Sequence, residues 1–258
     1  MQNMTVESRS RAMEILAKKI ESGRASALDL FKRVNEEAPH DVAAKGRTIQ
    51  FGAASASLYL SLGRETNPLG IHRHALGQLA SRAGVPGAYL DTLANGNDWQ
   101  RSLGAEILNR HYHDGAPATR YLVRSVKGVA RGVLSDKYRR LDSRPLVETF
   151  ATECQKVGAV SIDGTVSDTR VALKALVPQV FEPVPGEVLA FGIEWSNSDF
   201  GHGVHAVRAF ILRVACLNGA TMENALAQVH LGRQLSDDIE LSKKTYDLDT
   251  KASMSVLR

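Results

Sequence analysis

The chain has 258 residues, of which 43% are hydrophobic and 23% charged, values that are ordinary for a globular protein. Wholesale disorder is therefore excluded, and the length suits one large domain or two small ones. The two cysteines, Cys154 and Cys216, lie far apart and form no CxxC pair, which excludes a zinc ribbon and a disulfide scaffold. No apolar run approaches the roughly 20 residues that span a bilayer, and the first residues lack an apolar signal core, so we expect a cytoplasmic protein without a membrane partner.

The first 70 residues are predicted to be helical and then irregular. Apolar residues recur at helical spacing over residues 5–38, Gly23 interrupts the pattern, and Ser26 can cap a second helix. Residues 41–71 are rich in alanine, serine and glycine, which favours a loop with one short strand at 57–60.

Three short helices and then a β pattern are predicted next. Glycine stops and a capping Asn97 divide residues 73–112 into three helices. Two strands separated near Lys127-Gly128 follow, and then a helix with Pro145 in its first turn. These last three elements are predicted at residues 121–123, 129–134 and 145–157.

The C-terminal third is predicted to be mainly β. Strands are expected at residues 159–162, 171–177 and 188–195. Residues 207–216 fit either a strand or a buried helix, and Thr221 can cap a helix to about Leu235. The order predicts an α+β fold, with a helical N-terminal part followed by a mostly antiparallel sheet on which one or more helices pack. We divide the chain into a helical or irregular segment 1–70, a core domain 71–235 and a tail 236–258.

A strongly basic stretch from Arg110 to Arg140 is the main functional lead. It holds eight arginines and lysines against two aspartates, a net charge of +6, whereas the whole chain carries +4, so the remaining residues sum to −2. Cationic side chains bind nucleic acid because they release counterions from its phosphates, and an aromatic ring such as Tyr138 can stack on a base. A solvated basic face with local salt bridges is the structural alternative. The predicted nucleic-acid-binding residues are Arg120, Arg124, Lys127, Arg131, Lys137, Tyr138, Arg139 and Arg140.

Other motifs give weaker indications of chemistry. Three histidine pairs lack an acidic partner at a recognisable spacing, so no metal site is predicted. The Gly201–Ala206 segment matches GxGxxA, but five residues separate it from the preceding strand, which favours a hairpin connection over a dinucleotide loop. We therefore predict no cofactor and no catalytic residue, and an enzyme site scattered over Asp199, His202 and His205 is the alternative. The histidine pairs are His72 with His74, His111 with His113, and His202 with His205.

Two segments resemble a known family. Gly132–Ser143, with the sequence GVLSDKYRRLDS, resembles a hydrophobic-Ser-Asp-Arg/Lys-Tyr-x-x-Leu-Asp segment of a phage- and plasmid-type family described as domain of unknown function 932. Trp195–Gly201 followed by Phe210–Gly219 resembles the same family's Asn-Ser-Glu-x-Gly and Cys-x-Asn-Gly segments, with Asp199 in place of the more usual glutamate. The resemblance covers roughly residues 70–235. It favours a strand at 207–216 and implies a role in the nucleic-acid metabolism of a mobile element.

Charge and resemblance together predict a protein that binds nucleic acid. Single-stranded DNA is the favoured partner, and annealing in recombination without ATP would fit the absence of a P-loop motif. A fold-level similarity to ring-forming single-strand annealing proteins is an analogy, and it makes a homo-oligomer an expected form. The alternative is a regulatory or host-interaction protein of a phage or plasmid that binds another protein through its basic stretch.

Overall fold

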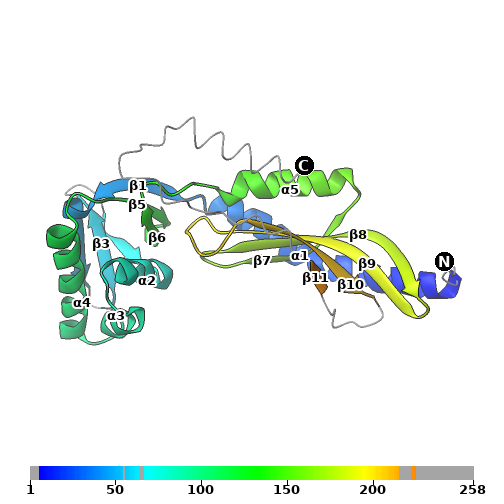
Figure 1. The fold of residues 1–258 in the computed structure, drawn as a ribbon, viewed down its shortest axis with the longest axis horizontal. Helices are drawn as coiled ribbons and strands as arrows, with labels where there is room; N and C mark the ends of the chain where they lie inside the picture. The colour runs from blue at the N-terminus through cyan, green and yellow to red at the C-terminus, as the bar shows by residue number, and fades with distance from the viewer. Residues whose placement is uncertain (1–5, 55, 64–66, 215–221, 225–258) are drawn as a thin grey trace.

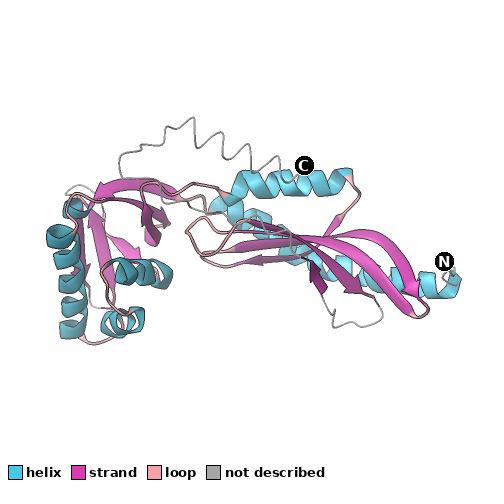
Figure 2. Cartoon of the chain, in the orientation of Figure 1, coloured by secondary structure: helices cyan, strands magenta, loops and turns pink. Residues whose placement is uncertain are grey.

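The computed structural model describes residues 6–54, 56–63, 67–214 and 222–224, and its shape is elongated with two lobes (Figure 1). Each lobe is built on its own β-sheet and has its own hydrophobic core. We call them the sheet A lobe, which contains the described residues between 40 and 135, and the sheet B lobe, which contains the N-terminal helix and residues 143–214 and 222–224. Helices and strands occur in both lobes, so the fold class is α+β as predicted (Figure 2).

The sheet A lobe holds six strands in the order β1-β5-β6-β4-β3-β2. All neighbouring strands are antiparallel except β4 and β6, which are parallel. The hairpin between β5 and β6 turns at Lys127-Gly128, and both residues have a positive φ, as a tight two-residue turn requires. The strands are β1 (His40–Lys45), β2 (Ile49–Ala53), β3 (Leu58–Leu62), β4 (Leu69–Ile71), β5 (Arg120–Val126) and β6 (Val129–Ser135).

Three helices cover one face of sheet A, at the places that the sequence predicts. They are α2 (Arg73–Arg82), α3 (Gly87–Ala94) and α4 (Asp98–Arg110), and short turns η1 (Gly46–Thr48) and η2 (His111–Gly115) complete the lobe. Helix α4 begins at a capping box, in which Asn97 and Gln100 each bond the other's backbone N–H. Leucines of the three helices pack on apolar residues of the strands, including Leu60 and Val123, and form the core of this lobe.

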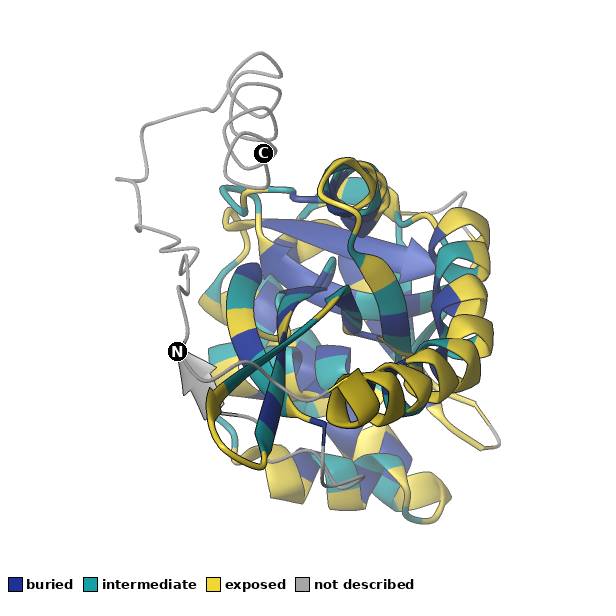
Figure 3. Cartoon of the chain, turned by 90° about the vertical axis from the view of Figure 1, so that its right-hand side faces the viewer, coloured by how far each residue is buried: buried dark blue, intermediate teal, exposed yellow. Residues whose placement is uncertain are grey.

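The sheet B lobe holds five antiparallel strands in the order β11-β10-β9-β8-β7, with two helices packed on them. Trp195, which is fully buried, stacks on Phe150 of the second helix at the centre of the main core. The elements are α1 (Val6–Glu36), α5 (Ser143–Lys156), β7 (Val160–Val166), β8 (Val171–Val184), β9 (Glu187–Asn197), β10 (Ala206–Arg213) and β11 (Met222–Asn224). Viewed along the long axis, exposed positions follow the outer sides of the helices, and buried positions gather inside (Figure 3).

Helix α1 runs without a break through Gly23, where the sequence predicts a helix end. The reason is a close backbone contact, because a methyl group on Gly23 would lie 1.6 Å from the carbonyl oxygen of Ile162 on β7. On the strand side, Gly164 approaches the backbone of Ser26 and Ala27 in the same way. Glycine is thus needed here for packing, and its low helix propensity is outweighed by tertiary contacts.

Residues 41–71 differ most from the sequence-based expectation. They form most of β1 together with β2, β3 and β4, in place of a loop with one short strand. Part of their pairing is local, since β2 pairs with β3 and β3 with β4, but β1 pairs with the distant β5, as in the pairing of Asp41 with Arg124. The predicted boundary near residue 70 therefore does not separate the two cores, since α1 belongs to the sheet B lobe while β1–β4 belong to sheet A.

The other predicted elements are found, most of them with small shifts at their ends, but β8 continues seven residues beyond its predicted end at residue 177, to Val184. Helix α5 and strands β5 to β9 lie where they are predicted, although Asp163-Gly164 continues β7 instead of closing it. Residues 206–213 form a strand, which resolves the ambiguity there. The helix predicted from Thr221 is wrong at its start, because Met222–Asn224 is strand β11, and its remainder lies outside the described residues together with the predicted tail 236–258.

Among the described helices, none is both long enough and apolar enough to cross a membrane.

Candidate functional site

Arg124, at the centre of the predicted nucleic-acid-binding set, lies inside the protein at the junction of the lobes. Its side chain is 1% exposed and donates to Asp41 at 2.7 Å, to Asp142 at 2.5 Å and to the backbone carbonyl of Asp199 at 2.7 Å. Burial lowers the pKa of this guanidinium, but the two carboxylates outweigh burial and raise it above its ordinary value. Arg124 therefore cannot contact a phosphate, and its role as a nucleic-acid contact is corrected to that of an internal ion-pair centre.

Lys127 and Arg131 are engaged by acidic residues of the sheet B lobe. Arg131 donates to Glu37 at 2.6 Å and to the backbone carbonyl of Asp168 at 3.2 Å, and Lys127 reaches Glu37 at 3.4 Å. Although burial opposes it, hydrogen bonds and charge from Arg131 and Arg33 lower the pKa of Glu37 below its ordinary value. Arg131 is thus held between the lobes, whereas Lys127 reaches Glu37 from a side chain that is 63% exposed.

Of the other residues in the predicted nucleic-acid-binding set, some are bonded inside the protein and others lie toward its surface. Arg120 pairs with Asp136 at 3.4 Å and Arg140 with Asp41 at 3.2 Å. The hydroxyl of Tyr138 donates to the carbonyl of Ser198 at 3.3 Å, and burial raises its pKa to about 12, so this ring is a junction residue and not an open stacking platform. Arg139 is exposed and Lys137 half-buried.

The two segments that resemble the phage and plasmid family meet at this junction. Asp199 Oδ1 accepts from both the backbone N–H and the hydroxyl of Ser143, at 2.8 and 2.6 Å. Asn197 donates to the carbonyl of Leu141 at 2.7 Å and to the Ser143 hydroxyl at 3.0 Å. Asp199 thus caps the N-terminus of α5 from a distant loop, where the helix dipole favours a carboxylate. Both segments act here as structural elements that join the lobes.

Asp199 is held in an environment that favours its neutral form. Burial raises its pKa to about 6 and the charge of Asp142 adds to this, against hydrogen bonds from Ser143 and the charge of Arg124. Between its ordinary pKa of 3.8 and about 6, the folded state keeps a proton that the unfolded state has lost. The contribution of Asp199 to stability therefore falls as pH rises through this window.

We expect Asp199→Asn to gain stability relative to the wild type as pH rises from 4.5 to 7.5. Asparagine keeps the oxygen that accepts from Ser143 but removes the buried charge. The gain is at most about 3 kcal/mol, because one pKa unit corresponds to about 1.4 kcal/mol. Urea unfolding of both proteins at the two pH values measures it, and a difference that stays constant with pH would contradict the assignment.

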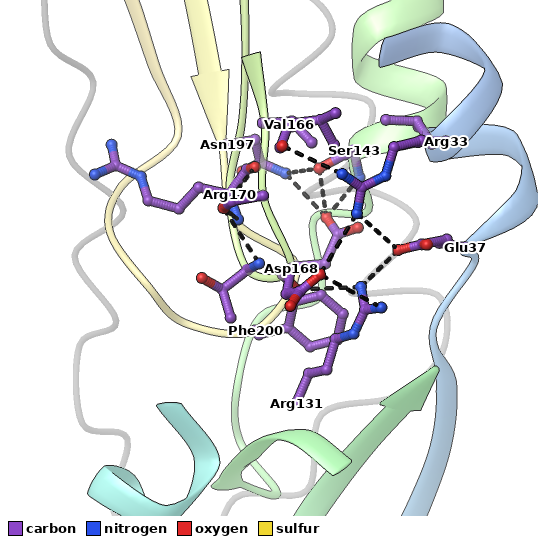
Figure 4. A pocket seen from close by; sticks show the side chains of 14 residues that line it. Arg33, Glu37, Arg131, Ser143, Val166, Asp168, Arg170, Asn197 and Phe200 are labelled. Atoms are coloured by element: carbon purple, nitrogen blue, oxygen red, sulfur yellow. Dashed lines mark hydrogen bonds and ion pairs between the residues drawn. The ribbon is translucent and has the colours of Figure 1, made fainter. Parts of the chain in front are cut away.

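A pocket lies between the lobes beside this capping interaction (Figure 4). It encloses about 340 Å³, part of which is open to solvent. The carboxylates on its walls match the guanidinium groups, so the pocket has no surplus charge to attract a polyanion. Its charged residues are Arg33, Arg131 and Arg170 with Glu37, Asp168 and Asp199.

The three residues of the alternative enzyme site point to different partners. Asp199 faces Ser143, His202 lies 2.6 Å from the Thr169 hydroxyl, and His205 is buried edge-on to Trp195. Within the described part of the chain, no group of three or more histidine, cysteine or acidic side chains has a geometry that could hold a metal ion. The structure thus brings no catalytic set together from these residues.

The GxGxxA segment connects two antiparallel strands, β9 and β10, and both of its glycines have a positive φ. A dinucleotide-binding turn leads from a strand into a helix, whose N-terminus binds the phosphates. This connection leads into a strand, so the hairpin interpretation of Gly201–Ala206 is confirmed.

An open hollow on the outer face of α2 was not predicted from the sequence. It is lined by Arg73, His74, Gly77, Gln78, Ser81 and Arg82, and none of these six is acidic. The positions fall on one side of a helix because they repeat at intervals of four residues. This spacing was visible in the sequence, but the sequence could not show that this side of α2 is partly open to solvent. Gln78 and Arg82 on this side also contact β6 and β5 of sheet A.

Arg73 and Arg82 stand at the two ends of this hollow. Arg73 is 83% exposed and pairs with Asp91 at 3.3 Å, an exposed contact of the kind that contributes little. Arg82 donates to the carbonyl of Gln78 at 3.0 Å and lies over the ring of Tyr121. Between them, the backbone at Gly77 is exposed, and a ligand can approach it closely.

Comparisons with protein-family models, curated proteins and solved structures found no match to this chain. The resemblance of the 132–143 and 195–201 segments to the phage and plasmid family therefore stays a prediction.

Proposed function

We propose that this protein binds nucleic acid, with single-stranded DNA as the favoured partner, through the outer face of α2. The supporting observation is the hollow between Arg73 and Arg82, which is cationic and has no acidic residue in its lining. In contrast, the pocket between the lobes is charge-matched. An annealing role in the recombination of a mobile element, in the cytoplasm and without ATP, is the form of this function that agrees with the sequence resemblance.

The surface beside the hollow adds to the positive charge. The loop at Gly201 lies next to α2 and next to the 136–140 segment, since a methyl group there would lie 3.3 Å from Gln78 Nε2 and 3.8 Å from the ring of Tyr138. Lys137 and Arg139 flank Tyr138 in the chain. Lys137 is half-buried and Arg139 is exposed. A strand of nucleic acid that follows α2 would therefore meet Arg73 and Arg82 at the two ends of the helix and pass close to the 136–140 segment.

We expect Arg73→Ala/Arg82→Ala to weaken binding of a labelled single-stranded oligonucleotide. If both arginines contact phosphates, the slope of log affinity against log salt should fall by about 1.4, which is about 0.7 for each contact. Fluorescence anisotropy across a salt series, with single-stranded and duplex oligonucleotides, measures the slope and the preference.

The matched control is Arg9→Ala/Arg11→Ala, which removes two exposed charges of α1, far along the chain in the other lobe. An equal loss of affinity in this control would show that net charge alone drives binding, and it would contradict the α2 site. If the wild type binds no oligonucleotide even at low salt, the nucleic-acid proposal is lost.

An exposed aromatic pair favours a second candidate function, the binding of another protein. Phe181 and Phe191 stack with ring centroids 4.5 Å apart on the β8–β9 hairpin, and Phe191 is 52% exposed. Val184, near the tip of the same hairpin, is also exposed. Exposed aromatic side chains of this kind are typical of protein-binding surfaces. This function becomes the preferred one if oligonucleotides fail to bind.

A further inference from the structure

Two histidines from different lobes stack on each other beside the hollow. His74 belongs to α2 of the sheet A lobe, and His202 belongs to the loop between β9 and β10 of the sheet B lobe. Their ring centroids are 4.6 Å apart and the planes differ by 20°. Two neutral imidazoles pack well in this arrangement, whereas two imidazolium ions at the same distance repel each other.

Hydrogen bonds fix both rings in the junction. Thr169 Oγ1 lies 2.6 Å from His202 Nδ1, and His74 Nε2 lies 3.0 Å from the carbonyl oxygen of Phe200. Gln78 donates to the same carbonyl at 2.9 Å, and its own Oε1 accepts from the backbone N–H of Val133 at 2.7 Å. Loop 198–203 is therefore attached to α2 and β6 through a small set of contacts around His74.

The charged groups around the pair are mostly positive. His72 lies beside His74, whose backbone N–H it accepts at 3.1 Å, and the His72 ring lies 3.5 Å from Asp168. Arg131 lies over the ring of Phe200, and Arg170 lies beside Gly203 in the same loop as His202. Arg73 precedes His74 on α2. Three arginines therefore oppose further positive charge. The carboxylates nearby are Asp168, Glu37, which accepts from Arg131, and Asp199 of the loop itself. Because burial favours the neutral form of Asp199, its protonation at acidic pH stabilises the loop and opposes release.

We propose that the His74–His202 stack is a proton-operated latch between the two lobes. When both rings are neutral, the stack holds loop 198–203 against α2. When both rings are protonated, their repulsion releases the loop and opens the junction. The latch needs no ligand, so it operates whether or not nucleic acid binds.

The direction in which the pKa of His74 is shifted agrees with the proposed latch. Burial lowers the pKa of His74 below its ordinary value, and the charges of His202 and His72 lower it further, against the hydrogen bond to Phe200. The unfolded or opened state then binds more protons than the closed state at acidic pH. Stability of the closed junction is therefore lost as pH falls below the ordinary histidine value of about 6.5.

The latch also regulates the α2 hollow, a consequence that rests on the proposed nucleic-acid function. His74 lines the hollow, so its protonation adds a positive charge to that surface. We infer that acidification both loosens the loop and strengthens the attraction of α2 for phosphates.

Hydrogen–deuterium exchange without nucleic acid tests the latch. Amides in residues 72–78 and 198–203 should exchange several-fold faster at pH 5.5 than at pH 7.5 after correction for intrinsic rates, because protonation destabilises the closed junction. In His202→Asn this acceleration should disappear, because the amide can still contact Thr169 but carries no charge. His40→Gln, at an exposed histidine of β1, should behave as the wild type.

A direct titration keeps the test valid if a variant fails to fold. The imidazole signals of wild-type protein, followed by NMR, should show a midpoint for His74 below 6.5. In His202→Asn that midpoint should move up. The latch would be overturned if amide exchange in the wild type did not change with pH. It would also be overturned if the His202 substitution left the titration midpoint of His74 unchanged. Oligonucleotide affinity at the two pH values then tests the nucleic-acid consequence separately.

Discussion

Replacing Arg124 with methionine should lower the free energy of unfolding by about 3 to 5 kcal/mol, the usual cost of removing one partner from a buried ion pair. The substitution leaves the carboxylate of Asp142 without its guanidinium, leaves Asp41 with Arg140, and removes a donor from the carbonyl of Asp199. Because these acceptors come from three separate segments of the chain, the loss should loosen β1, the start of α5 and loop 198–203 together. Urea denaturation followed by circular dichroism measures the change.

Arg110→Met is the matched control for this prediction. Arg110 also pairs with a carboxylate, Glu106, but the pair is exposed on the surface of α4 and four residues apart, so we expect little change in stability. The double variant Arg124→Met/Asp142→Asn should recover part of the loss, because it also removes the carboxylate that Arg124→Met leaves without its guanidinium. Equal, small effects of Arg124→Met and Arg110→Met would show that the junction does not depend on the buried ion pair.

Gly23→Ala should destabilise the protein by about 1 to 3 kcal/mol or more, as overpacking of a tight contact does. The added methyl group would lie 1.6 Å from the carbonyl oxygen of Ile162, so α1 and β7 must move apart. Alanine has the higher helix propensity, and its effect alone would be stabilising. A loss of stability therefore reports the helix–strand contact and not the helix itself.

Gly77→Ala should change the free energy of unfolding in the opposite direction when it is measured in the same experiment. Gly77 lies on the exposed side of α2, and a methyl group there meets no atom within 4 Å. We expect a gain of about 0.5 to 1 kcal/mol from helix propensity alone. If the two glycines respond alike, the close approach of α1 to β7 is not the reason for glycine at position 23.

Local signals in the sequence were sufficient for the elements whose ends are set by nearby residues. The capping pair of Asn97 and Gln100 defines the start of α4, and Lys127-Gly128 defines the β5–β6 turn, since both depend on contacts within a few residues. Residues 41–71 lack such signals. The strands β2, β3 and β4 pair with their neighbours in this segment, but the segment joins the sheet through distant partners, as β1 pairs with β5 about 80 residues later and β4 pairs with β6.

The sequence predicted the candidate site only in part, because the site also depends on contacts between residues that are distant in the chain. The excess of cations between Arg110 and Arg140 is a property of the sequence, but their pairing is not. Glu37 and Asp168 neutralise Arg131 from positions 94 and 37 residues away. The hollow on α2 consists of ordinary helix residues, and only the packing of α2 on sheet A and on loop 198–203 shows that they line an open hollow.

The sequence by itself determined the α+β class, the order of most helices and strands, and the location of the positive charge along the chain. Periodicity, caps and turns are local properties, and they do not depend on which distant segments meet. Only the tertiary structure decided that the basic stretch joins two lobes, that the two motif segments lock against each other at Ser143 and Asp199, and that α2 carries the open cationic surface. These outcomes depend on contacts between residues far apart in the chain, which form only when both sheets have assembled.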